Sequence, residues 1–141
     1  MAVDTSAGFQ YMGRLHGGPD LQDYFLFKDD ETLTRGDIVN LESGEVDLGA
    51  TNDSGFLGIA LETKAGTDST TEILCTWAPD AIFSVYDPNA RVRGATLDLS
   101  GATGAQTVAA TSNADFIVIG GFGADERTLV MFVAGETWMD R

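Results

Sequence analysis

Short apolar runs separated by polar or glycine-containing turns make up most of the chain from Asp23 onward. Runs of this length, bounded by such turns, are typical of β-strands. No long stretch keeps the helical period of about 3.6 residues, so we predict little helix apart from one short turn near Ala78–Ala81. The predicted strands are Tyr24–Lys28, Ile38–Leu41, Glu45–Leu48, Phe56–Glu62, Glu72–Trp77, Ile82–Tyr86, Thr96–Leu99, Gln106–Ala110, Phe116–Gly120 and Thr128–Ala134.

The pattern repeats once, over residues 33–77 and 91–134. Glycine, apolar and polar positions recur in the same order in both halves. The matching segments are Gly36–Leu41 with Gly94–Leu99, each followed by a Ser-Gly turn, and Ala50–Ile59 with Ala110–Ile119, which aligns Phe56 with Phe116. One half alone could not bury both faces of its strands. We therefore predict one all-β domain over residues 23–141, a small β-barrel or sandwich built from two pseudo-repeated halves.

The first 22 residues do not follow this pattern. Glycine or proline at positions 8, 13, 17, 18 and 19 interrupts any periodicity, yet large apolar side chains lie between them. We predict that residues 1–22 form an irregular N-terminal arm that becomes ordered against a neighbouring molecule; the alternative is a frayed terminus. The predicted contact residues are Phe9, Tyr11, Met12, Arg14 and Leu15 in the arm, with Trp138 and Met139 near the other end of the chain. For the C-terminal pair the alternative is packing across the open end of the barrel.

The net charge narrows the range of partners. The 141 residues include 22 Asp and Glu against 8 Lys and Arg, which gives a formal net charge of −14, while 43% of the residues are hydrophobic, as in a folded chain. Nucleic acids and anionic membranes bind through cationic side chains, so we predict neither as a partner. Lysine is scarce and aspartate outnumbers glutamate, which favours a halophilic source. The alternative is a mesophilic acidic protein bound to a basic partner.

Candidate catalytic residues are few. His16 is the only histidine, and it lies in the glycine-rich arm, where no third group would orient it as the base of a Ser-His-Asp triad. Paired carboxylates for acid–base catalysis need two different environments in one cleft, and no cluster of carboxylates stands out. Cys75 is the only cysteine, so no internal disulfide can form. We predict no enzymatic activity and no cofactor.

Several other motifs are better explained by turns than by ligands. Acidic turns at Asp29–Glu31 and Asp47–Asp53 offer oxygen ligands for Ca²⁺ or Mg²⁺ but lack the ligand spacing of an EF-hand loop, so we predict no metal site. The Arg-Gly-Asp triplet at 35–37 falls at a turn before a strand, which favours turn chemistry over cell adhesion. The glycine-rich segment 120–123 precedes acidic residues that would repel phosphate. The Asn-Asp-Ser sequence at 52–54 fits a glycosylation acceptor.

The repeated segments resemble a known family. The chain reads Thr-Arg-Gly-Asp-Ile-Val at 34–39, Glu-Ser-Gly-Glu-Val at 42–46 and Gly-Phe-Leu-Gly-Ile-Ala-Leu-Glu at 55–62, and the second half repeats this series. Over residues 33–135 it resembles the small head decoration proteins of tailed viruses. The resemblance implies a β-rich protein without catalytic residues. Such a protein binds as a homotrimer to the major capsid protein on the outside of the virus head and cements neighbouring capsomers.

Residues 1–10 lack the basic start and apolar run of a signal peptide, so we predict synthesis in the host cytoplasm. The resemblance implies a final location on the exterior of the virion. An alternative function is a small carbohydrate-binding β-sheet module, whose sign would be an exposed aromatic platform formed by Trp77, Phe83 or Tyr86. An enzyme would instead require a deep pocket with converging carboxylates.

Overall fold

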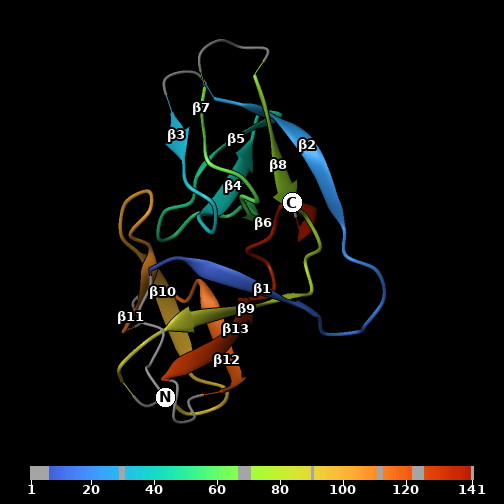
Figure 1. The fold of residues 1–141 in the computed structure, drawn as a ribbon. Helices are drawn as coiled ribbons and strands as arrows, with labels where there is room; N and C mark the ends of the chain where they lie inside the picture. Colours follow the sequence, from blue (N-terminus) through green and yellow to red (C-terminus); the bar gives the residue numbers. More distant parts are fainter. Residues whose placement is uncertain are drawn as a thin grey trace.

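The computed structural model describes residues 7–28, 31–66, 71–89, 91–110, 113–121 and 126–140. Over these residues the fold is all-β, as the sequence predicts, with two main sheets and one short pair of strands (Figure 1). Figure 1 shows the sheets as two halves of the molecule, one containing β2–β8 and the other containing β1 and β9–β13. Neither sheet closes into a barrel within the described residues.

The six-stranded sheet combines the first strand with the C-terminal half of the chain. Its strands, in spatial order, are β1 (Phe9–Arg14), β9 (Ala81–Tyr86), β13 (Arg127–Phe132), β12 (Phe116–Gly121), β10 (Thr96–Ser100) and β11 (Thr107–Ala110). Every neighbouring pair is antiparallel. Buried residues alternate with half-buried ones along most of β12, as expected of a strand with one face towards a core.

The five-stranded sheet is formed by the N-terminal half. Its strands, in spatial order, are β6 (Phe56–Ile59), β4 (Ile38–Glu42), β5 (Glu45–Leu48), β2 (Gln22–Phe27) and β8 (Glu72–Thr76). The β2–β5 pair is parallel, and the other pairs are antiparallel. The short pair consists of β3 (Thr32–Leu33) and β7 (Lys64–Ala65), and a 3₁₀ turn, η1 (Trp138–Asp140), follows the last strand. At Ala78–Ala81, where the sequence predicts a short helical turn, the structure has a turn closed by a hydrogen bond from Ala81 N to Ala78 O (3.2 Å) and no helix.

The prediction of an irregular N-terminal arm is wrong for residues 9–14, which form β1 at the edge of the six-stranded sheet. Phe9 pairs with Val85 of β9, and only 3% of Phe9 is exposed. Gly13, with φ of 118°, lies at a β-bulge, where a positive φ favours glycine. Because a bulge shifts the inward–outward alternation by one residue, it conceals a strand from pattern analysis.

The two sheets share one aromatic core. Phe56 from β6 stacks on Phe132 from β13, in the other sheet, with ring centroids 5.1 Å apart. Phe116 stacks on Phe132 (5.5 Å), and Phe9 stacks on Phe116 (5.3 Å). A second cluster of buried side chains packs against the five-stranded sheet. It consists of Phe27, Leu33, Val39, Val46, Leu57, Ala60, Ile73 and Cys75. Because rings from both sheets lie in the first cluster, the sheets belong to one packed unit.

A buried carboxylate also joins the sheets. Asp37, just before β4, is completely buried and accepts hydrogen bonds from Thr34 N (2.8 Å), Thr103 Oγ1 (2.6 Å) and Gly104 N (2.9 Å). Thr103 and Gly104 lie in the β10–β11 loop of the six-stranded sheet. The aspartate of the Arg-Gly-Asp triplet therefore serves the fold and is not presented to a receptor.

Two further buried side chains reinforce this junction. The Gln106 side chain accepts a hydrogen bond from Ile38 N (2.6 Å) and donates one to Gly49 O (2.9 Å). Asp115, before β12, accepts a hydrogen bond from Asn52 N (2.9 Å) across the same junction. Buried polar groups with all these partners fix how the two sheets sit relative to each other.

Gly58 in β6 has no room for a side chain. A Cβ there would overlap both Oγ1 and the carbonyl O of Thr76, which is itself buried. Because one of these atoms is backbone, we expect Gly58→Ala to lower the free energy of unfolding by about 1–3 kcal/mol or more, measured by urea denaturation. Gly120→Ala in β12 is the matched control, because its Cβ would lie 3.6 Å from the flexible end of Arg93. Equal losses in both variants would contradict this packing.

Candidate functional site

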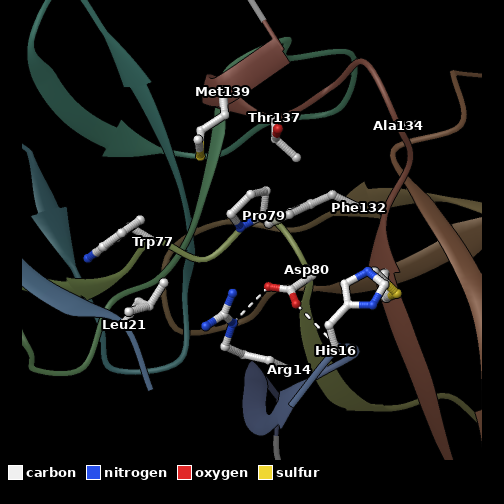
Figure 2. Close-up of a pocket in the computed structure, with 11 residues that line it drawn as sticks. Arg14, His16, Leu21, Trp77, Pro79, Asp80, Phe132, Ala134, Thr137 and Met139 are labelled. Carbon is white, nitrogen blue, oxygen red and sulfur yellow. Dashed lines mark hydrogen bonds and ion pairs between the residues drawn. The ribbon is translucent and has the colours of Figure 1, made fainter. Parts of the chain in front are cut away.

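A groove of about 540 Å³ lies where the chain crosses between the two sheets (Figure 2). Residues 15–21 lead from β1 to β2, residues 77–80 lead from β8 to β9, and residues 133–137 follow β13. All three connections contribute to its lining, which consists of Arg14, His16, Leu21, Trp77, Pro79, Asp80, Met131, Phe132, Ala134, Thr137 and Met139. Since the connections are anchored at both sheets, the fold fixes the shape of the groove.

An ion pair lies on one side of the groove. Arg14 Nε donates a hydrogen bond to Asp80 Oδ1 (2.9 Å), and His16 N donates one to Asp80 Oδ2 (3.3 Å). Burial opposes ionisation of Asp80, but these hydrogen bonds outweigh it and lower the pKa of its carboxyl below the usual value. Asp80 is therefore ionised at neutral pH and holds the Arg14 side chain, of which 21% is exposed.

Other lining residues give the groove an apolar wall. Trp77 packs edge-to-face on Trp138 with ring centroids 6.2 Å apart, and Trp138 Nε1 donates a hydrogen bond to Trp77 O (3.1 Å). This contact fixes η1 against the β8–β9 connection. Met139, in the same turn, is 56% exposed at the groove, and Leu21 lines it from the β1–β2 connection.

The structure brings two of the predicted contact residues, Arg14 and Met139, to this groove. The prediction that Phe9 is a contact residue is wrong, because its ring is buried in the shared core. Trp138 is half-buried and packs on Trp77 of its own chain.

The remaining predicted contact residues lie outside the lining of the groove. Met12 and Leu15 are exposed, so both are available to a partner. Tyr11 is half-buried against Phe83, with ring centroids 6.4 Å apart. Burial, followed by the nearby Asp20 carboxylate, raises the pKa of the Tyr11 hydroxyl to about 12. Tyr11 thus serves the packing of β1 and stays neutral in the physiological range.

Sequence reasoning missed the groove residues Leu21, Pro79 and Asp80. It placed Trp77 at a strand end and named it only for the aromatic platform of the alternative carbohydrate-binding function. These residues lie in connections, whose meeting point depends on the tertiary fold. The aromatic platform expected of a carbohydrate-binding module cannot include Phe83, which is completely buried.

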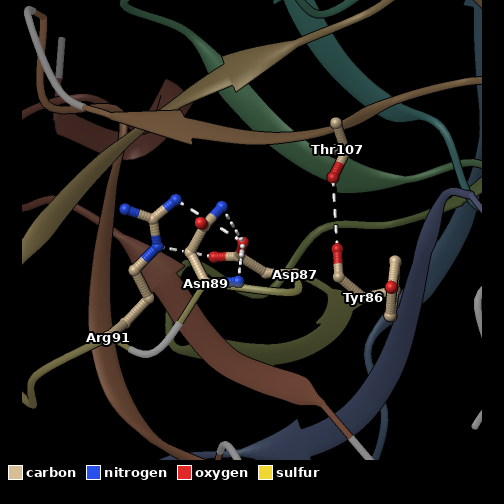
Figure 3. Close-up of polar contacts among 5 residues, drawn as sticks. All are labelled: Tyr86, Asp87, Asn89, Arg91 and Thr107. Atoms are coloured by element: carbon tan, nitrogen blue, oxygen red, sulfur yellow. Dashed lines mark hydrogen bonds and ion pairs between the residues drawn. The ribbon is translucent and has the colours of Figure 1, made fainter.

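A second ion pair lies in the turn after β9 (Figure 3). Asp87 is buried and accepts hydrogen bonds from Arg91 Nε (2.6 Å) and from the backbone N–H (3.1 Å) and side chain (3.2 Å) of Asn89. Thr107 Oγ1 donates a hydrogen bond to Tyr86 O (3.2 Å), which ties this turn to β11. The Asp87 carboxylate is bound to residues of its own turn. Catalysis by paired carboxylates requires two carboxyl groups in one cleft, and this ion pair supplies one.

Metal binding finds no support in the part of the chain that the structure describes. There, no group of three or more His, Cys, Asp or Glu side chains could hold an ion. Of the two acidic turns, one includes Asp29 and Asp30, which lie outside the described residues. In the other, Asp53 accepts a hydrogen bond from Ala50 N (2.8 Å), and Asp47 pairs with a lysine at 3.7 Å.

The remaining motifs have clear positions. Asn52 of the glycosylation sequence is exposed in a turn, with φ of 69°. Cys75 is completely buried, and burial raises the pKa of its thiol to about 12, so the thiol is unreactive in the folded protein. Gly120 and Gly121 end β12, and the rest of segment 120–123 lies outside the described residues.

Comparison with protein-family models gives no match, and the search of curated proteins finds no significantly similar sequence. Over the described residues, none of the helical structure is long and apolar enough to cross a membrane. The interpretation of function therefore depends on the geometry of this chain and on the resemblance within its repeated segments.

Proposed function

We propose that this protein is a head decoration protein, a homotrimer that binds the major capsid protein on the outside of a virus head and stabilises the junctions between capsomers. The observation that carries the proposal is the distribution of polar and apolar groups. The buried carboxylates of Asp37, Asp87 and Asp115 accept hydrogen bonds from other groups of the fold. Large apolar side chains such as Met12 and Met139 are exposed instead. This distribution suits binding to a protein surface better than catalysis.

The proposal includes a pseudo-repeat of the two halves, supported first by backbone hydrogen bonds. In each half a central strand, β4 or β10, lies between two others, β5 and β6 or β11 and β12. The turns before the central strands make the same bonds at the same spacing along the chain. In the first half, Gly36 N donates to Ala60 O and Ala60 N donates to Asp37 O. In the second half, the equivalent bonds run from Gly94 N to Val118 O and from Val118 N to Ala95 O.

The polar residue within each central strand supports the pseudo-repeat a second time. Asn40 Oδ1 in β4 accepts a hydrogen bond from Gly55 N (3.0 Å) just before β6. Asp98 Oδ1 in β10 accepts hydrogen bonds from Asn113 N and Ala114 N (both 2.9 Å) shortly before β12. Two buried side chains at matching positions thus close matching turns. A barrel or sandwich built from two such halves is the architecture we propose for the complete domain.

The proposed mechanism is mechanical. A DNA-filled head experiences outward pressure, and each bridging contact adds binding free energy that must be lost before capsomers separate. Three linked subunits hold more firmly than one, because the second and third attachments become intramolecular. Such a protein needs complementary surfaces and a stable body, and no reacting group.

The acidic surface is proposed to suit a halophilic source. We expect the midpoint of thermal unfolding to rise steeply between low salt and about 1 M NaCl, because salt reduces the Debye length to about 3 Å and screens repulsion among the excess carboxylates. Circular dichroism melts at several salt concentrations measure this. A midpoint that stays flat, or that rises equally with sucrose, would contradict adaptation to salt.

The function itself is tested by heads that lack the protein. We expect heads from a virus with this gene deleted to release DNA at a lower temperature than wild-type heads, and purified protein to restore the wild-type temperature. Measurement of DNA release by a fluorescent dye during heating gives both results. Heads that are equally stable without the protein would overturn the proposal.

A further inference from the structure

The guanidinium of Arg14 has donors at the groove that the fold does not use. Its Nε is bound to Asp80, and its Nη1 lies 3.5 Å from Pro19 O, at the limit of a hydrogen bond. Among the described residues Nη2 has no acceptor. An arginine offers five N–H donors, and because the Arg14 side chain is partly exposed, its Nη2 donors stay open to solvent and to a ligand. The groove is thus suited to a ligand with a hydrogen-bond acceptor.

Charge narrows the kind of acceptor. Asp80 is ionised beside the guanidinium, and Asp20 lies close enough to act on the nearby Tyr11 hydroxyl. The whole chain carries a formal net charge of −14. A free carboxylate or phosphate would be repelled by these groups, whereas the neutral carbonyl of a peptide bond would not. The acceptor that fits is therefore a main-chain carbonyl.

The apolar wall of the groove favours a ligand that also carries an apolar side chain. Leu21, Trp77 and Met139 line the groove beside Arg14. We propose that this groove binds a loop of the major capsid protein, which inserts an apolar side chain against this wall, presents a main-chain carbonyl to Arg14 Nη2 and carries a flanking Lys or Arg. This inference rests on the proposed function and assigns its capsid-binding surface.

Charge complementarity favours this occupant over a second copy of the chain. A second copy has only 8 Lys and Arg among its 141 residues, so few of its segments could bring a basic residue beside Asp80 and Asp20. A loop with a basic residue is instead attracted over a distance by the acidic body and docks by its apolar side chain. The contacts that hold the trimer together are then expected elsewhere on the surface.

The proposal is tested by cross-linking on the virus head. The full chain is prepared with p-benzoylphenylalanine in place of Met139, bound to heads from the gene-deleted virus, and irradiated. The matched control carries the same residue in place of Val92, an exposed apolar position outside the groove. We expect the Met139 variant to cross-link to one capsid-protein loop that contains apolar and basic residues, and the control to give no cross-link to that loop.

A binding measurement accompanies the cross-link. Met139→Asp is expected to weaken binding to the same heads about tenfold or more, because a charge would be buried against an apolar side chain, whereas Val92→Asp should bind as wild type. Cross-links to a second copy, or a Met139→Asp variant that binds heads as tightly as wild type, would overturn the groove as the capsid-binding site. The proposed decoration function would still stand if the wild-type protein binds the heads. Wild-type protein that fails to bind heads would overturn both.

Discussion

Asp37→Ala is expected to lower the free energy of unfolding by about 3–5 kcal/mol, the largest effect of any single polar substitution in the described residues. The carboxylate is completely buried and satisfies two backbone N–H groups and the Thr103 hydroxyl. Alanine would leave those three donors without an acceptor. Because Thr103 and Gly104 lie in the β10–β11 loop of the other sheet, the substitution also loosens the junction between the sheets. Urea denaturation at molar salt measures the loss.

Two variants decide whether the effect comes from this carboxylate. Asp37→Asn keeps the shape but replaces one acceptor by a donor, so we expect an intermediate loss. Glu72→Ala, on the exposed surface of β8, is expected to change stability by no more than about 0.5 kcal/mol. A loss for Asp37→Ala no larger than that for Glu72→Ala would contradict the role of Asp37 as the link between the sheets.

Phe9→Ala is expected to cost about 3–5 kcal/mol, whereas Met12→Ala, three residues later on the same strand, should stay within about 0.5 kcal/mol. The Phe9 ring stacks on Phe116 and packs edge-to-face on Phe83 (6.4 Å), and its loss would leave a cavity in the shared core. Met12 is 56% exposed and leaves no cavity. Thermal and urea unfolding of the two variants, side by side, measure the difference.

Because residues 9–14 form β1, deletion of the N-terminal residues is expected to affect folding. A flexible arm could be removed without harm to the fold, but removing residues 1–19 takes away all of β1 and the Phe9 ring. We expect this deletion to unfold the six-stranded sheet, seen as lost cooperativity and lost near-ultraviolet circular dichroism. A truncated protein that melts like the full chain would contradict the position of β1.

The all-β class could be predicted from the sequence because most strands are short apolar runs that end at glycine or polar turns. β12 illustrates this, since the apolar run from Phe116 ends at Gly120 and Gly121. β1 could not be recognised, because polar Gln10 interrupts its apolar residues and Gly13, at a bulge, itself suggests a turn. The register between paired strands could not be predicted from the sequence either. Phe56 and Phe116 align in the sequence, but Val39 pairs with Gly58 while its counterpart Leu97 pairs with Phe116.

The groove illustrates a different limit. Arg14 and Met139 could be singled out as large side chains near the chain ends, but Trp77 and Asp80, which line the same groove, lie in the middle of the sequence. They meet because three connections cross between the sheets at one place. A crossing of this kind depends on the order of strands in both sheets, which local patterns of apolar residues do not determine.

Electron cryomicroscopy of the purified parent particle tests the proposal that this protein coats a virus head. We expect density for this two-sheet fold on the outer surface, as trimers at capsomer junctions in hundreds of copies. We also expect the groove beside Arg14 to face the shell. A map without this density, or a protein present in only a few copies per particle, would overturn the proposed function.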